Sequence, residues 1–139
     1  MRGAIIGDVI GSTHEFANRV RSKEFELFPP KSTFTDDTVL TIAVYDSLTN
    51  DIPLEESFMK WIERYPQRGY GGMFFKWITS KEKKPYNSKG NGSAMRISPV
   101  GWLYDTEQEV LREAKRVSEI THNHIEGIEC AQAVAMCIL

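Results

Sequence analysis

The chain has 139 residues, a formal net charge of −2, and hydrophobic and charged fractions of 41% and 26%. This length suits one domain with a substantial core, and the composition is typical of a soluble globular protein. The charge balance excludes a strongly basic nucleic-acid binder. The one basic cluster, Lys81, Lys83 and Lys84, encloses Glu82 and is typical of a solvated turn, so we expect no nucleic-acid-binding patch.

The sequence gives no indication of membrane insertion or export. No apolar run approaches the roughly 20 residues that a membrane helix needs. The N-terminus, MRGAIIGDVIG, has one basic residue and is interrupted by Asp8, unlike a signal peptide. Cys130 and Cys137 would lie about 10 Å apart in a helix, too far for a disulfide. We therefore expect a cytoplasmic protein in which both cysteines are buried free thiols.

Helical patterns run through most of the chain, and no strand-like alternation of useful length occurs. We expect an all-α protein, with a closely packed Gly-rich helix at the start, an irregular segment over residues 18–34, and a polar loop over 80–91. Thr106 and Glu109 fit a capping box, and Pro99 is expected to stop the short helix before it. The expected helices cover residues 2–13, 36–50, 53–65, 72–79, 92–98 and 107–120.

The final stretch, IEGIECAQAVAMCIL, is expected to form a last helix. From Cys130 to Leu139 only Gln132 is polar, and a helix that is apolar on nearly all sides must be buried. The stretch also reaches Leu139 without a capping residue for its last carbonyls. We therefore expect that the natural domain continues beyond this point, or that something else covers this helix.

Two adjacent carboxylates begin the 36–50 helix, within the sequence TFTDDT. Thr35 at the N-cap, with Asp36 and Asp37 in the first turn, would stabilise the start of the helix. The same hydroxyl and carboxylates are oxygen ligands of the kind that Mg²⁺ prefers. Both interpretations stay open, and a metal site would need further ligands from elsewhere in the chain.

Three other stretches contain candidate functional residues. Glu15 follows a Gly-bounded helix, where the helix dipole disfavours a carboxylate, so it is either a solvated residue or a functional one. The stretch SKGNGSAMR is either an anion site at a Gly-rich turn or simply a flexible loop. In ITHNHIEG, a zinc site at His122 and His124 lacks suitably spaced partners. A hydrogen bond from His122 to a ligand is the more plausible role.

Four stretches, taken together, resemble the ADP-ribosylglycohydrolase family, which includes the dinitrogenase reductase-activating glycohydrolases and the ADP-ribosyl-acceptor hydrolases. The resemblance implies an all-α orthogonal bundle around a two-magnesium cleft, and removal of ADP-ribose from a protein side chain or related acceptor. From residue 3 to the end, the four stretches follow the family's order and spacing: GAIIGDVIGSTHE, FTDDTVLT, YNSKGNGSAMRISPVGWL and ITHNHIEGIECAQAVA.

The resemblance also implies roles for the candidate residues. Thr35, Asp36 and Asp37 match the motif that ligates the metals, and Glu15 matches the glutamate that positions or activates water. Glu15, Asp36 and Asp37 are therefore the candidate catalytic residues. The candidate substrate-binding residues match the family's Gly-rich stretch, which holds the diphosphate and ribose, and its Thr-His turn: Gly90, Asn91, Gly92, Ser93, Met95 and His122.

One family feature is missing from the chain. Family members carry a second acidic motif, of the Asp-x-Asp-Thr type, which supplies the remaining metal ligands, and none follows residue 105. Residues 1–139 therefore resemble the N-terminal part of the family domain, and we expect an impaired hydrolase. Two alternatives are an ADP-ribose-binding module without hydrolysis and an association-only remnant. Self-association would use the apolar C-terminal helix.

Overall fold

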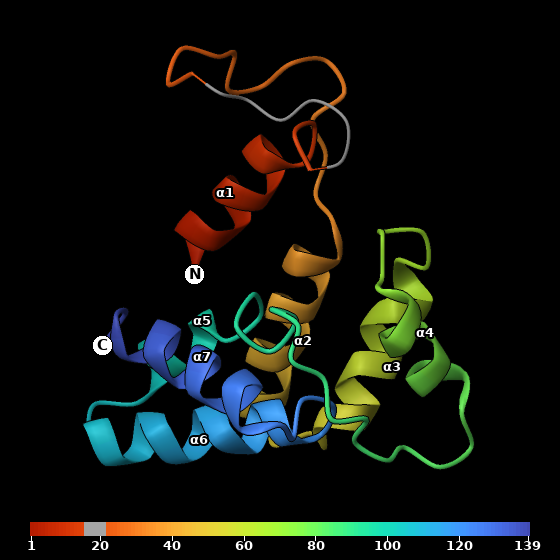
Figure 1. Ribbon diagram of the computed structural model, residues 1–139, viewed down its shortest axis with the longest axis vertical. Coiled ribbons are helices and arrows are strands. Elements are labelled where there is room, and N and C mark those ends of the chain that lie inside the picture. The colour runs from red at the N-terminus through yellow and green to blue at the C-terminus, as the bar shows by residue number, and fades with distance from the viewer. Residues whose placement is uncertain (16–21) are drawn as a thin grey trace.

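The computed structural model describes residues 1–15 and 22–139 (Figure 1). These residues contain no strand, so the all-α prediction is confirmed. None of their helices is both long and apolar enough to cross a bilayer. The helices are α1 (Arg2–Gly11), α2 (Asp36–Asn50), α3 (Leu54–Arg64), α4 (Gly72–Thr79), α5 (Ser98–Leu103), α6 (Glu107–Glu119) and α7 (Ile125–Met136).

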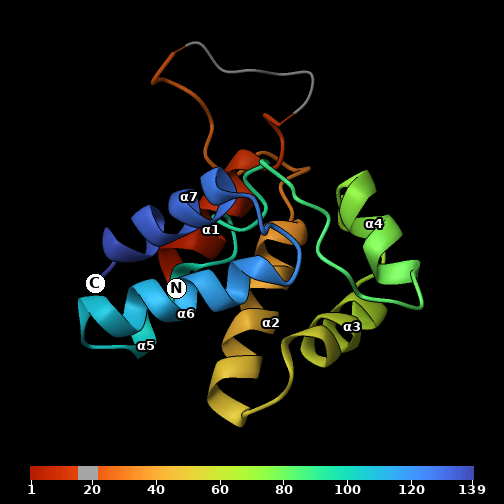
Figure 2. The same cartoon turned by 60° about the horizontal axis from the view of Figure 1, so that its bottom comes forward.

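Helix α2 is the central element of the bundle. It contacts α1, α3 and α5, while α6 packs along α7. Figure 1 shows α2 upright, with α6 and α7 running across its lower part, and Figure 2 shows α3 and α4 beside it on the other side. The start of α2 therefore projects towards α1, away from the layer that α6 and α7 form.

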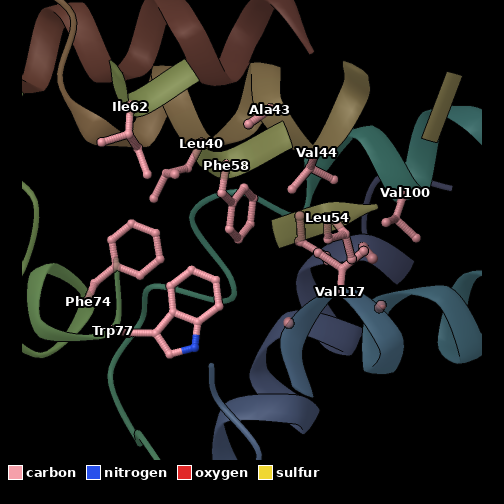
Figure 3. Packing of buried hydrophobic residues seen from close by; sticks show 14 of the residues in the cluster. Leu40, Ala43, Val44, Leu54, Phe58, Ile62, Phe74, Trp77, Val100 and Val117 are labelled. Atoms are coloured by element: carbon pink, nitrogen blue, oxygen red, sulfur yellow. The ribbon is translucent and has the colours of Figure 1, made fainter. Parts of the chain in front are cut away.

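The core forms where α2, α3 and α4 meet. Leu40 and Val44 of α2 face the Phe58 ring of α3 (Figure 3). That ring is fully buried, and its centroid lies 5.9 Å from Phe74 and 6.3 Å from Trp77 of α4. Burial of apolar surface from three helices fixes the position of α2, and with it the carboxylates at its N-terminus.

Both expected N-caps are present. The Thr35 hydroxyl accepts a hydrogen bond from the Asp37 N–H at 3.3 Å, and the Thr106 hydroxyl accepts one from the Glu109 N–H at 3.3 Å. Each bond satisfies a donor that the first turn of a helix leaves without a partner. The capping interpretation of TFTDDT is therefore confirmed, which leaves the metal interpretation to the geometry of the site.

Two expectations about helices are wrong. The expected helix over 92–98 is absent, because residues 91–96 form hydrogen-bonded turns. Pro99 does not stop a helix but lies in the first turn of α5. Proline is tolerated there because the first N–H groups of a helix have no intrahelical partner. Close packing of α1 is also wrong, because α1 buries no residue and an added Cβ at Gly3 or Gly7 would meet nothing within 4 Å.

Helix α7 is buried on one face only. Its inner face lies against α5, where an added Cβ on Gly101 would come within 2.5 Å of the Ala135 carbonyl oxygen. Cys130 and Cys137 are free but exposed, so the prediction of buried thiols is wrong. The outer face of α7 keeps apolar surface exposed, with Val134 37% exposed, so the expectation that something else covers this helix stays a prediction. Self-association through this helix stays a prediction.

Candidate functional site

A carboxylate-lined cavity of about 570 Å³ lies between the end of α1 and the start of α2. Glu15, Thr35, Asp36 and Asp37 all line it, although Glu15 is far from the other three in the sequence. The structure therefore brings together every residue that the sequence suggests for metal binding and water activation. We call this space the carboxylate cavity.

Asp8 of α1 organises this cavity and was missed as a site residue. Its carboxylate accepts hydrogen bonds from the Thr35 N–H at 2.8 Å and hydroxyl at 2.6 Å. It also accepts from the Thr38 N–H at 3.2 Å and hydroxyl at 2.5 Å. A carboxylate in the short apolar helix was the available signal. Asp8 ties α1 to α2 and orients the Thr35 oxygen.

The carboxylates of α2 lie in an electrostatically unfavourable place for two anions. Burial, then the neighbouring Asp37, Glu15 and Asp8 charges, raises the pKa of Asp36 to about 7. Burial, then Asp8 and Glu15, raises the pKa of Asp37 to about 6. The fold holds these carboxylates close together in a partly desolvated place, and a cation would relieve their mutual repulsion.

These groups fit a partial magnesium site. Thr35 donates its proton to Asp8 and accepts one N–H, which leaves one acceptor position on its oxygen. With Asp36 and Asp37 it offers hard oxygen donors, and Mg²⁺ normally keeps several waters beside one or two carboxylates. Over residues 1–15 and 22–139, no group of three His, Cys, Asp or Glu side chains converges as a metal site. The fit is therefore to a weakly held, hydrated ion.

A second cavity, of about 300 Å³, adjoins the first. It is lined by Gly90, Asn91, Gly92, Met95 and His122, which are five of the six candidate substrate-binding residues. Both cavities share Asp36, Gly71, Asn91 and Met95, so the Gly-rich loop spans the two. We call the second space the loop cavity.

Ser93 is the candidate that the structure does not bring to either cavity. It is fully buried, and its hydroxyl donates to the Gly127 carbonyl oxygen at 2.8 Å. Gly127 lies close to the loop, since an added Cβ there would be 2.9 Å from the Ser88 carbonyl oxygen. Ser93 therefore fastens the loop to the first turn of α7.

The turn before α7 holds the other side of the loop cavity. The Tyr86 N–H donates to the Thr121 carbonyl oxygen at 3.2 Å, and the Asn87 N–H donates to Asn123 Oδ1 at 2.8 Å. His124 caps α7 by accepting from the Glu126 N–H at 3.2 Å. The hydrogen-bond partner of His124 is thus a backbone group. Of these two histidines, only His122 lines the loop cavity.

Sequence reasoning missed two further residues of the loop cavity, Tyr86 and Arg96. Tyr86 lies in the expected polar loop, and its ring centroid is 5.7 Å from that of His122. Arg96 is 1% exposed. An arginine between the apolar residues Met95 and Ile97 was the available signal, because charged side chains are rarely buried without a reason.

His122 gives a pH prediction. Burial, then the positive charge of Arg96, lowers the pKa of His122 to about 4 from an ordinary value of 6.5. The unfolded chain therefore binds a proton more readily, and the stability due to neutral His122 is lost as pH falls from 6.5 to 4. We expect wild type to lose more stability than His122→Gln between pH 7 and 4.5 in urea unfolding. Equal losses of stability in wild type and His122→Gln would contradict the lowered pKa of His122.

Comparisons with known proteins identify relatives of this chain. Residues 1–139 match the ADP-ribosylglycohydrolase family. The chain is 26% identical to ADP-ribosylhydrolase ARH3 of Mus musculus, over 99% of this chain and 46% of that protein. It is 26% identical to ADP-ribosylhydrolase ARH3 of Gallus gallus, over 99% and 48%, and 27% identical to that of Homo sapiens, over 76% and 34%. The chain spans about half the length of the mouse and chicken relatives.

Proposed function

Because the chain belongs to the ADP-ribosylglycohydrolase family, we propose that it takes part in magnesium-dependent hydrolysis of the bond between ADP-ribose and a protein side chain or related acceptor. The proposal rests on one observation, the adjoining carboxylate and loop cavities. Asp36, Asn91 and Met95 line both of them. A ligand with its diphosphate at the Gly-rich loop would therefore extend towards the carboxylates.

The loop cavity suits the ADP part of such a ligand. Glycine backbone at 90 and 92 allows phosphate oxygens to approach N–H groups closely. The Tyr86 ring and the Met95 side chain provide apolar surface beside them. Contacts far from the reacting bond would hold the ribose in place, so binding free energy supports orientation at the bond that breaks.

The carboxylate cavity suits the cleavage step. Thr35, Asp36 and Asp37 would hold Mg²⁺, which when bound stabilises oxygen ligands and lowers the pKa of a coordinated water. Cleavage of the ribosyl bond builds positive charge at the anomeric carbon. Glu15 lines the same cavity and is exposed, so its carboxylate is placed to orient the attacking water and accept its proton.

We expect residues 1–139 by themselves to bind Mg²⁺ weakly and turn over slowly. Their described part contains no convergent set of three ionisable ligands, and Mg²⁺ favours near-octahedral coordination. Robust magnesium-dependent release of ADP-ribose by the purified chain would contradict this expectation. The proposed acceptor of the ADP-ribose is a protein side chain or a related group.

The first test is calorimetric titration of ADP-ribose into the chain, with and without Mg²⁺. We expect Mg²⁺ to strengthen the binding of ADP-ribose. Asp36→Asn should lower the affinity measured with Mg²⁺ about tenfold or more, since a bond to a charged group contributes about 1.5–3 kcal/mol. Asp105→Asn is the matched control, because Asp105 is exposed and lies outside both cavities.

The outcomes separate the proposal from its alternative. Binding that ignores both Mg²⁺ and Asp36→Asn would favour an ADP-ribose-binding module that does not hydrolyse its ligand. No binding in either condition would contradict the proposal for this length of chain. Equal losses in Asp36→Asn and Asp105→Asn would indicate a general charge effect instead of a site at α2.

A further inference from the structure

Arg96 is a buried cation beneath the Gly-rich loop. Its guanidinium lies 4.8 Å from the centroid of the Phe58 ring. Among the described residues it forms no ion pair. Its Nη2 donates to Thr121 Oγ1 at 2.7 Å and to the Val117 carbonyl oxygen at 3.3 Å. Because guanidinium has only donors, the Thr121 oxygen must act as the acceptor in this bond.

The same Thr121 oxygen lies 2.8 Å from Nδ1 of His122. A hydroxyl has one proton to donate and two lone pairs to accept with. The Arg96 N–H occupies one lone pair of the Thr121 oxygen, and the Thr121 proton still needs an acceptor. Among the hydrogen bonds of the described residues, the acceptor within reach of Thr121 Oγ1 is Nδ1 of His122, so the Thr121 proton is directed to Nδ1.

The opposite arrangement is unfavourable. A proton on Nδ1 would add a further donor to the Thr121 oxygen and displace the Thr121 proton from its acceptor. Thr121 is 0% exposed, and a donor without a partner at a buried position is destabilising. A doubly protonated ring would also place its charge beside Arg96, which already lowers the His122 pKa.

With Nδ1 as an acceptor, a neutral His122 ring carries its proton on Nε2. That edge of the ring faces the Gly-rich loop, because an added Cβ on Gly92 would lie 3.0 Å from Nε2 and one on Gly90 would lie 3.9 Å from it. Nε2 has no protein hydrogen bond among the described residues, and the ring lines the loop cavity. The Nε2–H is therefore available to a ligand.

We propose that Arg96 and Thr121 are positioning residues that hold His122 as the Nε2–H tautomer, so that this N–H donates to an oxygen of ADP-ribose over Gly90 and Gly92. The identity of the ligand rests on the proposed function. The tautomer rests only on the Arg96, Thr121 and His122 geometry.

Nitrogen-detected NMR of the full chain, labelled at histidine, tests the tautomer directly. The wild-type His122 ring is expected to show a protonated Nε2 and an unprotonated Nδ1 at pH 7. A protonated Nδ1 in wild type would overturn the proposal whether or not ADP-ribose binds. This measurement needs no variant, so a variant that fails to fold does not affect it.

Two substitutions then connect the tautomer to ligand binding. Thr121→Val removes the hydroxyl but keeps the shape, and we expect it to shift the tautomer and weaken ADP-ribose binding about 5- to 10-fold, as loss of one hydrogen bond implies. Thr121→Ser keeps the hydroxyl and should restore both. Thr49→Val, at an exposed threonine of α2, is the control.

Different outcomes test the role of Thr121 and the identity of the ligand. An unchanged tautomer and an unchanged affinity in Thr121→Val would overturn the role of Thr121. A wild-type chain that has the Nε2–H tautomer but binds no ADP-ribose would overturn the ligand assignment, and with it the proposed function, while leaving the positioning of His122 in place.

Discussion

Phe58→Ala is expected to lower the free energy of unfolding by about 3–5 kcal/mol, the usual cost of removing a buried aromatic side chain. Phe58 is 0% exposed, and its ring packs against Phe74 and Trp77. The ring also lies under the Arg96 guanidinium, so its removal leaves a buried cation beside a cavity. Urea unfolding followed by circular dichroism measures the change.

Phe75→Ala is the matched control for this substitution. Phe75 lies on α4, next to Phe74, but it is 55% exposed. We expect its truncation to cost well under about 1 kcal/mol, in keeping with surface positions. Phe58→Leu should fall between the two because it keeps much of the apolar volume. Similar losses for Phe58→Ala and Phe75→Ala would mean that the core is not centred on α3.

The helices that could be predicted from the sequence are those with local signals. Helix α2 has a threonine N-cap, two acidic residues in its first turn, and a buried stripe with Leu40, Ala43 and Val44. Helix α6 has the Thr106 cap and an apolar stripe. In both helices, capping and apolar periodicity act within a few residues, so the local sequence is enough to predict them.

The errors arose where distant contacts decide the structure. The turns over 91–96 are fixed by the Ser93 bond to Gly127, which a local helix rule does not anticipate. Helix α1 was expected to pack closely, yet Ile6 is 51% exposed, and the outer face of α7 has Val134 37% exposed. Composition indicates that a helix has an apolar surface, but not which element covers it.

The candidate site also contains residues that the sequence suggests and one, Asp8, that depends on distant contacts. Residue chemistry alone left Thr35, Asp36 and Asp37 as either caps or ligands, and the resemblance to a family connected them with Glu15. The structure places all four in one cavity. Asp8 was missed because its partners lie 27 and 30 positions further along the chain, and no spacing rule connects them.

Asp8→Ala is expected to release α1 from α2 and to reduce the free energy of unfolding by about 2–3 kcal/mol, since hydrogen bonds to a charged group contribute about 1.5–3 kcal/mol each and are not additive. α1 buries no residue, so few apolar contacts would hold it once the carboxylate is gone. Thr38, only 6% exposed, would lose the acceptor of its hydroxyl. Hydrogen exchange along α1, together with urea unfolding, measures both effects.

Release of α1 also has a consequence for the site, because Glu15 follows α1 and reaches the carboxylate cavity through it. Asp8→Ala should therefore weaken Mg²⁺ binding although Asp8 is not proposed as a metal ligand. Asp8→Asn keeps one carbonyl acceptor and should lose less of both properties, and Asp105→Ala should lose neither. Protected α1 amides in Asp8→Ala would show that apolar contacts, not the Asp8 hydrogen bonds, hold this helix in place.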